Sequence, residues 1–454
     1  MLDAIQLQWL IILVSGLAFF WIAPVSRTVA EFFSALSAKG KQPGVFMLTS
    51  SLVISWIFAK SITNAANLGL QFGFVGGVAY AVYYLSFVVA GIVIYQMRVK
   101  GGFQSIHHFL QRRFGRSAVV IFSLLVGFRL FNEVWSNTMV IGSYFGDAGS
   151  SSYYASILVF TGLTLAYTLK GGLRSSLLTD AIQMILFGLL LFVLLGFILP
   201  KGGGVIKFVH SGSWEMAGGL NLLFAALIQV FSYPFHDSVM TDRGFISNPK
   251  TTLISFLWAA LIGFFCITAF SFIGIYAQFA GLQGQAAVEV SKLLGLAGML
   301  AMNFIMVTSA ASTLDSAFSS FSKLIVIDLG NKKHQTVKRG RLMMVLLTIL
   351  GTLPIFAGPE ILSATTISGT MVIGLAPVFL FWKLKPPKLS FYLSVGSGVL
   401  IGILLATGTF PERLIYFDGK YADLLASNIW GTVLCFSLFF GPILLMRNGK
   451  TESD

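Results

Sequence analysis

The chain has 454 residues, of which 56% are hydrophobic and only 10% are charged, and its mean hydropathy is +0.85. A soluble domain carries about 25% charged residues, so the composition excludes an ordinary soluble protein and indicates that most of the surface faces lipid. The net charge of +13 does not indicate nucleic-acid binding, because the basic residues of membrane proteins collect in cytoplasmic loops. Cys266 and Cys435 lie in apolar runs and form neither a disulfide framework nor a metal-spaced cluster.

Apolar runs follow one another along the chain. A helix that crosses the bilayer needs about 20 mostly apolar residues, and about 13 such runs occur. We therefore predict an all-α, polytopic membrane protein whose single transmembrane domain spans residues 1–454, with no room for a second, soluble domain. The first run lacks a basic leader and a cleavage site, so it is read as a retained helix. The expected spans are residues 6–24, 44–72, 75–97, 117–146, 151–169, 175–199, 218–240, 252–280, 296–327, 340–357, 361–383, 389–407 and 426–446.

The basic residues give these spans an expected orientation. One set of alternate loops, together with the C-terminal tail, holds most of the 30 Lys and Arg residues. Arg243, which follows the seventh span, is counted in this set. The opposite loops hold Lys201, Lys207, Lys292, Arg413 and Lys420. The N-terminus is therefore expected outside and the C-terminus in the cytoplasm, in the plasma (inner) membrane.

Two spans contain helix-breaking features. Residues 59–67 of the second span are unusually polar, and their side chains compete for backbone hydrogen bonds, so a break is expected within this stretch. In the seventh span Pro234 removes a backbone donor, so a break is expected at residues 232–237. Broken helices at corresponding positions of two halves mark the solute site of an inverted-repeat transporter. Each predicted break falls in the first helix of its half, but the two halves show no residue-level repeat.

Several ionisable residues lie in the middle of the predicted spans. Each costs at least ~2.5 kcal/mol at bilayer depth and is therefore a candidate functional residue. They are Lys60, Arg129, Glu133, Asp180, Asp237 and Asp315. Arg129 and Glu133 are four residues apart and can form a structural ion pair on one helix face. Alternatively, Arg129 binds a solute carboxylate, because a guanidinium matches that group bidentately.

The ninth span is rich in small and hydroxyl residues between Thr308 and Ser322. Close helix packing explains most of them, but it does not explain the buried charge of Asp315. Hard cations prefer oxygen ligands. For sodium, such ligands are offered by Ser309, Ser312, Thr313, Asp315 and Ser316.

Three stretches of the chain resemble the sodium/solute symporter family, which includes proline, sugar, pantothenate and sialic acid symporters. They are AKSITNAANLG (59–69), GGLRSSLLTDAIQ (171–183) and SAASTLDSAFSSFSKLIVID (309–328). The resemblance implies the LeuT-type inverted repeat of five plus five helices. The implied boundaries are 6–24 for an extra N-terminal helix, 44–199 and 218–383 for the two repeats, and 389–446 for two extra C-terminal helices.

The resemblance also implies site residues. A general sodium site would use Ala59, Ile62, Ser309, Ser312 and Thr313. A second sodium, or a proton in its place, would use Asp180, Ser312, Asp315 and Ser316. The solute would contact Ser61, Thr63, Ala66 and Asp237, and the chemistry of the guanidinium group adds Arg129 to this set. Lys60 departs from the family, because a small polar residue is common at its position.

The predicted function is sodium-coupled symport of a small organic solute by alternating access. An amino acid or a carboxylate is favoured, because Asp237 suits an amine and Arg129 suits an acid. A proton-coupled symporter of the same fold and a transporter-like solute sensor remain as alternatives. An enzyme is not expected, because the chain has no Cys/His cluster, nucleotide loop or nucleophile elbow. The expected partners are the solute, sodium and the lipid bilayer, without a cofactor besides the coupling ion.

Overall fold

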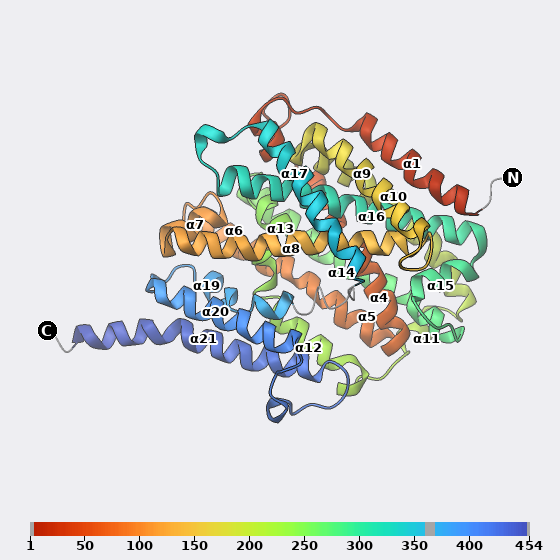
Figure 1. Cartoon of the computed structure of the whole chain (residues 1–454). Coiled ribbons are helices and arrows are strands. Elements are labelled where there is room, and N and C mark those ends of the chain that lie inside the picture. Colours follow the sequence, from red (N-terminus) through yellow and green to blue (C-terminus); the bar gives the residue numbers. More distant parts are fainter. Residues whose placement is uncertain (1–3, 359–367, 452–454) are drawn as a thin grey trace.

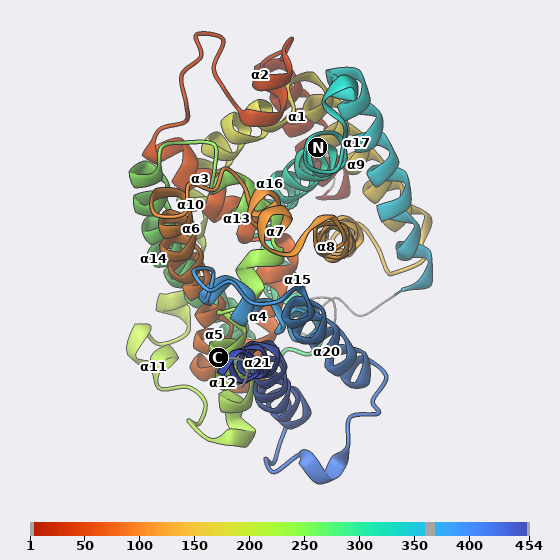
Figure 2. The ribbon, with the colours of Figure 1, turned by 90° about the vertical axis from the view of Figure 1, so that its left-hand side faces the viewer.

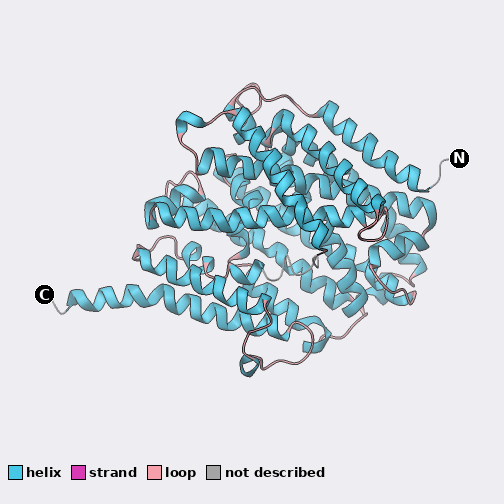
Figure 3. Cartoon of the chain, viewed as in Figure 1, coloured by secondary structure: helices cyan, strands magenta, loops and turns pink. Residues whose placement is uncertain are grey.

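The computed structural model describes residues 4–358 and 368–451, and within these ranges it contains helices and loops but no β-strand (Figure 3). Ten helices are long and apolar enough to cross a membrane, and a bent pair of shorter helices brings the number to as many as eleven within the described residues. The long helices run roughly side by side, with the N-terminus at one end of the bundle and the C-terminus at the other (Figure 1). The chain is thus a multi-pass, all-α membrane protein.

The helices follow the order of the predicted spans. Those of the first half are α1 (Ala4–Ile22), α2 (Val29–Ser34), α3 (Val45–Trp56), α4 (Ala59–Phe72), α5 (Phe74–Ala81), η1 (Val82–Leu85), α6 (Ser86–Val99), α7 (Ile106–Phe114), α8 (Arg116–Gly142), α9 (Ser151–Gly171), α10 (Leu173–Lys201) and α11 (Val205–Val209). Those of the second half begin with η2 (Met216–Leu220), α12 (Asn221–Gln229), η3 (Tyr233–His236), α13 (Ser238–Arg243), α14 (Pro249–Phe279), α15 (Ala286–Leu293), α16 (Gly295–Lys323) and η4 (Leu324–Asp328). The remainder are η5 (Lys332–His334), α17 (Val337–Thr352), η6 (Leu353–Ala357), α19 (Leu375–Leu380), α20 (Lys388–Ala406), η7 (Glu412–Leu414) and α21 (Ala422–Thr451).

Short polar side chains fix where several helices begin. The hydroxyl of Ser105 accepts a hydrogen bond from the third residue of α7, and that of Ser150 does the same for α9. The side chain of Asn248 caps α14, whose first residue is Pro249. Each cap satisfies a backbone N–H that has no partner within the helix, and proline is suited to the first position because it has no N–H to satisfy.

The first broken span is bent at a different place from the one predicted. Helices α3 and α4 meet at an angle of 58°, and the break lies at Ile57 and Phe58. The stretch 59–67 is helical, so the prediction of a break within it is wrong. Its polar side chains are satisfied without opening the helix: the Thr63 hydroxyl donates to the Ala59 carbonyl at 3.1 Å. The Tyr84 hydroxyl instead satisfies the carbonyl of Trp56, at 2.6 Å, where α3 ends.

The second predicted break is confirmed. Helix α12 ends at Gln229, a short 3-10 turn with Pro234 follows, and α13 begins at Ser238. Proline cannot donate the hydrogen bond that would continue a helix through this region. Helix α13 lies inside the bundle, against α3, α6 and α16 (Figure 2).

The predicted total of 13 spans is not confirmed. Residues 218–240 form short segments rather than one long helix. The predicted span 361–383 falls partly on residues 359–367, which lie outside the described residues, and α19 belongs to its later part.

Helix α14 approaches α4 closely at two glycines. A Cβ atom on Gly274 would lie 1.6 Å from the carbonyl oxygen of Ala66, and one on Gly69 would lie 2.1 Å from that of Ser271. Such distances are far below atomic contact, so any side chain at these positions would force the helices apart. The two glycines therefore set the separation of the broken span from the long helix behind it.

Candidate functional site

Two buried polar clusters lie where the broken spans meet α8, α10 and α16. The first, called the Arg129 network, consists of Lys60, Arg129, Glu133, Tyr233 and Asp237. The second, called the Arg243 network, consists of Ser51, Ser55, Ser176, Asp180, Arg243, Ser312 and Ser316. The residues of both clusters are buried inside the molecule.

Local backbone structure positions Asp237. The 3-10 turn before it contains Pro234, and Asp237 is the residue that caps α13. Its Oδ1 atom accepts a hydrogen bond from the Met240 N–H at 3.1 Å. The other carboxylate oxygen is therefore turned away from α13 and faces the first broken span and α8. The Trp56 indole donates to this oxygen at 2.8 Å.

Arg129 on α8 is the centre of the Arg129 network. Its Nε and Nη2 atoms donate to Asp237 Oδ2 at 2.9 and 2.6 Å, and Nη1 donates to the Tyr233 hydroxyl at 2.5 Å. Nη2 also lies 3.1 Å from Glu133 Oε1. The second oxygen of Glu133 is 2.8 Å from the Lys60 ammonium. The network joins α4, α8 and the second break.

The charges of this network cancel. Two cations, Lys60 and Arg129, face two carboxylates, Glu133 and Asp237, and all four residues are at most 4% exposed. A buried charge whose partner is removed costs roughly 3–5 kcal/mol. The two residues predicted to bind opposite ends of a zwitterion, Arg129 and Asp237, are therefore bound to each other.

An aromatic cage lies beside the Arg129 network. A cavity of about 20 Å³ is lined by Trp56, Phe58, Ser61, Tyr80, Tyr83, Tyr84 and Tyr233. The Ser61 and Tyr80 hydroxyls are 3.2 Å apart, and the Asn64 amide donates to Tyr80 at 3.3 Å. The cavity has room for about one water molecule, so it is too small for an organic solute in the described conformation.

Arg243 is the centre of the second cluster and is completely buried. Its Nε donates to the Ser51 hydroxyl at 2.6 Å, and its Nη2 donates to that of Ser316 at 2.7 Å. Nη2 lies 3.3 Å from Asp180 Oδ2. Ser51 donates to the same Asp180 oxygen, and Ser312 donates to the other, both at 2.5 Å.

Asp315 lies next to the Arg243 network on α16. One of its oxygens accepts from Ser176 at 2.7 Å, and the other accepts from Tyr167 at 2.8 Å and from Thr179 at 3.0 Å. Within the described part of the chain Asp315 takes part in no ion pair. Hydroxyl donors alone therefore stabilise its buried carboxylate.

The residues predicted for the general sodium site lie on two packed helices, α4 and α16. Ala59 and Ile62 are in the first turn of α4, directly after the break. On α16 the Thr313 hydroxyl donates to the Ser309 carbonyl at 2.9 Å. The Ser309 hydroxyl is buried and has no hydrogen-bond partner among the described residues. An unpartnered buried oxygen of this kind fits a site that takes a small cation.

The structure brings together only part of the predicted solute site. Arg129 and Asp237 are bonded, and Ser61 lines the aromatic cage. Thr63 bonds to its own helix. The carbonyl of Ala66 faces Gly274 of α14, and Ala66 is not among the residues that line the cage.

Five residues of the two networks are not among the predicted site residues: Arg243, Ser51, Ser55, Ser176 and Tyr233. Arg243 belongs to the set of basic residues expected in cytoplasmic loops, and that expectation is wrong because the residue is wholly buried. It follows an apolar run and precedes a loop, so its position along the chain gave no sign of burial. The spacing of Ser51 and Ser55, four residues apart on α3, did carry a signal, because it places both hydroxyls on one helix face.

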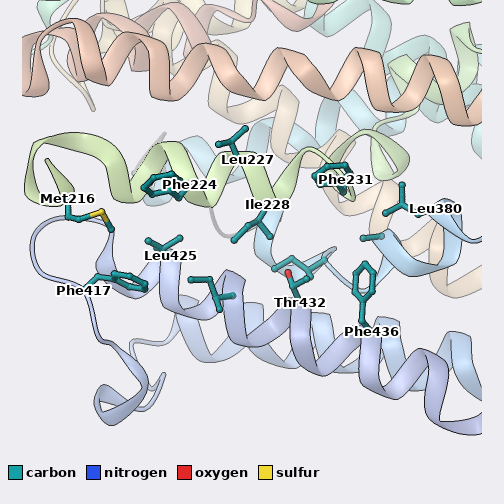
Figure 4. Close-up of a pocket in the computed structure, with 13 residues that line it drawn as sticks. Met216, Phe224, Leu227, Ile228, Phe231, Leu380, Phe417, Leu425, Thr432 and Phe436 are labelled. Atoms are coloured by element: carbon teal, nitrogen blue, oxygen red, sulfur yellow. The ribbon is translucent and has the colours of Figure 1, made fainter. Parts of the chain in front are cut away.

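Two larger cavities lie away from these clusters. One, of about 410 Å³, is lined by polar residues that include His107, Asp242, Lys323 and Asp328. The Lys323 ammonium bridges Asp242 at 2.7 Å and Asp328 at 3.0 Å, and burial of His107 on α7 lowers the pKa of its imidazole. The other, of about 710 Å³, is an apolar cavity between α12 and α21 (Figure 4). It contains none of the charged residues described above.

Comparison with known proteins gives consistent matches. The model of the sodium:solute symporter family matches residues 38–217. Sodium/glucose cotransporter 1 of Ovis aries is 25% identical over 178 residues, which are 37% of this chain and 27% of that protein. Sodium/myo-inositol cotransporter 2 of Mus musculus is 23% identical over 425 residues, which are 77% of this chain and 62% of that protein. The chain therefore spans less than two thirds of the length of these curated relatives.

Solved structures show the same fold. A Na+-coupled sialic acid symporter in a substrate-bound, outward-open state has a TM-score of 0.68 at 16% identity, over 96% of this chain and 98% of that one. MhsT in complex with L-phenylalanine has a TM-score of 0.55 at 15% identity, over 87% and 97% of the two chains. At these identities the likeness concerns the fold alone, which is the predicted LeuT-type fold.

Proposed function

The chain resembles the sodium:solute symporter family, and from this premise we propose that it is a secondary active transporter that carries a small organic solute together with sodium by alternating access. The observation that carries the proposal is the meeting of two broken spans, α3–α4 and α12–α13, with the hydroxyl-rich helix α16 around buried charges. Broken helices supply unpaired backbone groups at the depth where a solute and an ion bind. The relatives of the chain, and the family that it resembles, are transporters and not enzymes.

The proposed sodium site combines the carbonyls of Ala59 and Ile62 with Ser309, Ser312 and Thr313. Sodium bound there would hold α4 against α16 and so favour the conformation in which the solute site is complete. Because the coupling between two ligands is reciprocal, the solute would then raise the affinity for sodium by the same factor. The predicted solute contacts, Ser61, Thr63, Ala66, Arg129 and Asp237, belong to the same proposal.

The paired charges favour an uncharged solute. A carboxylate solute would have to displace Asp237 and Glu133 from Arg129, and an amine would have to displace Arg129 from Asp237. The cage instead offers aromatic faces together with the Ser61 and Tyr80 hydroxyls and the Asn64 amide. These groups suit a neutral, hydroxyl-bearing ring, and the curated relatives include glucose and myo-inositol cotransporters. An amino acid or a carboxylate, favoured by the isolated sequence, is the competing solute class.

The test is uptake into proteoliposomes from a panel of hexoses, inositols, amino acids and carboxylates, with and without a sodium gradient. We expect uptake of a neutral, hydroxylated solute that depends on sodium. The Ser312→Ala variant should lose at least tenfold in apparent sodium affinity, because it removes one of the proposed ligands.

The panel also separates the alternatives. Sodium dependence that is unchanged in Ser312→Ala would refute the proposed site. Uptake driven by a pH gradient in sodium-free buffer would identify a proton-coupled carrier. Binding of a solute without uptake would identify a sensor. Selective uptake of an acid or a zwitterion would refute the neutral solute class.

A further inference from the structure

The guanidinium of Arg243 lies at the position that is predicted for a second coupling ion. Of the residues predicted there, Asp180 and Ser316 both contact the guanidinium of Arg243, at 3.3 and 2.7 Å. Ser312 is bound to Asp180 at 2.5 Å. The cation that faces Asp180 is therefore part of the chain itself.

Side chains on three other helices hold the guanidinium. It enters from α13, beside the second break, and its contacts come from Ser51 on α3, Asp180 on α10 and Ser316 on α16. Arg243 is 0% exposed. Because hydrogen bonds fix Arg243 to three other helices, the residue is part of the core and is not a surface side chain.

The oxygen atoms that a second ion would need are already engaged. Asp180 Oδ2 accepts from Ser51 and faces Arg243, while Oδ1 accepts from Ser312. A sodium ion bound to Asp180 and Ser316 would lie against the guanidinium, and two like charges in contact repel strongly in a buried site. The donor set of the second site therefore does not fit an additional cation while Arg243 is in place.

We propose that the Arg243 guanidinium takes the place of a second sodium ion, so that the carrier binds one sodium per transport cycle. The inference rests on the proposed function, because it concerns the stoichiometry of the coupling ion. It assigns to Arg243 a positioning function: the arginine holds Asp180, and Asp180 holds the hydroxyl of Ser312.

The charge of Asp180 is already matched within the chain. Arg243 faces the Asp180 carboxylate at 3.3 Å, and Asp315 has hydroxyl partners only, among them Ser176 at 2.7 Å. Ser312 connects Asp180 with the general sodium site, because its hydroxyl donates to Asp180 and its oxygen lone pairs remain for an ion at the general site.

The experiment is a count of sodium ions on the purified full-length protein, with 22Na+ in a scintillation proximity assay. We expect one ion per protein. In Ser312→Ala the bound ion should be lost. Ser320→Ala is the matched control: it lies one turn beyond Ser316 on the same helix, is buried, and has no hydrogen-bond partner among the described residues. It should keep one ion.

A second variant tests the arginine directly. In Arg243→Gln the positive charge is gone, so the count should rise from one to two, whereas Arg243→Lys should still bind one. Two ions on the wild-type protein, or a count that stays at one in a folded Arg243→Gln protein, would overturn the inference. A wild-type count of zero would instead overturn the proposed function, so the two failures are distinguishable. The wild-type and Ser320→Ala counts remain decisive if Arg243→Gln does not fold.

Discussion

At the scale of single residues, the buried charges of both networks have their partners on other helices: Glu133 faces Lys60, and Asp180 faces Arg243. Lys60, Glu133, Asp180 and Asp315 are all recognisable as mid-span charges, because a charge within an apolar run is conspicuous. Which charges pair depends on how distant helices pack, and spacing along one helix reveals only the contact between Arg129 and Glu133. Arg243 lies at the edge of an apolar run, where a snorkelling residue and a buried one look the same in sequence.

The Arg129 network makes a prediction at this scale. Glu133→Gln removes the carboxylate that faces both Lys60 and Arg129, so it leaves an uncompensated buried positive charge and should lower the free energy of unfolding by about 3 kcal/mol. The double variant Lys60→Met with Glu133→Gln restores neutrality and should recover part of this loss. Thermal unfolding in detergent measures both effects. A double variant that is less stable than Glu133→Gln would show that charge balance is not what the network provides.

At the scale of helices, the two breaks differ in how far they could be predicted. Pro234 marks the second break unambiguously, because its chemistry forbids the continuing hydrogen bond. The first break follows no proline. The polar stretch 59–67 stays helical because its side chains find partners within α4 and on α5, α8 and α15. Lys60 pairs with Glu133 at 2.8 Å, and the Asn67 side chain accepts from the Ala286 N–H at 3.0 Å. Those partners are invisible in the local sequence.

The contact of α4 with α14 makes a prediction at the scale of helices. Gly274→Ala places a Cβ atom 1.6 Å from the Ala66 carbonyl oxygen, so the helices must separate, at a cost of about 1–3 kcal/mol or more. Both the melting temperature and the transport rate should fall. Gly396→Ala on α20 is the matched control, because a Cβ atom at that position would meet no neighbouring side chain or helix within 4 Å. If Gly274→Ala behaves like that control, the close approach of the two helices does not limit stability.

At the scale of the whole molecule, composition alone was enough to predict a polytopic helical bundle, and the long apolar helices confirm it. The number of spans was less predictable. A broken span consists of short helices, each of which is below the length that identifies a transmembrane helix in a sequence. Residues 218–240 are an example. The LeuT-type fold was recognised from motifs rather than from hydropathy, which does not encode how helices are arranged.

The proposed orientation makes a prediction at this scale. The loops rich in Lys and Arg should face the cytoplasm. In a background without Cys266 and Cys435, Tyr416→Cys should react with a membrane-impermeant maleimide on right-side-out vesicles, and Lys338→Cys should react only after the vesicles are opened. Both positions are exposed. The reverse labelling pattern would invert the orientation.

The buried guanidinium of Arg243 has one more consequence. A free ion occupies its site according to its concentration, but a covalently attached one is present at every concentration. If one of two cation positions is permanently filled by the chain, then uptake should rise with external sodium along a hyperbola rather than a sigmoid. At low sodium concentration the uptake rate of such a carrier would fall in proportion to the sodium concentration. The uptake rate of a carrier that must bind two sodium ions from solution would fall with the square of that concentration.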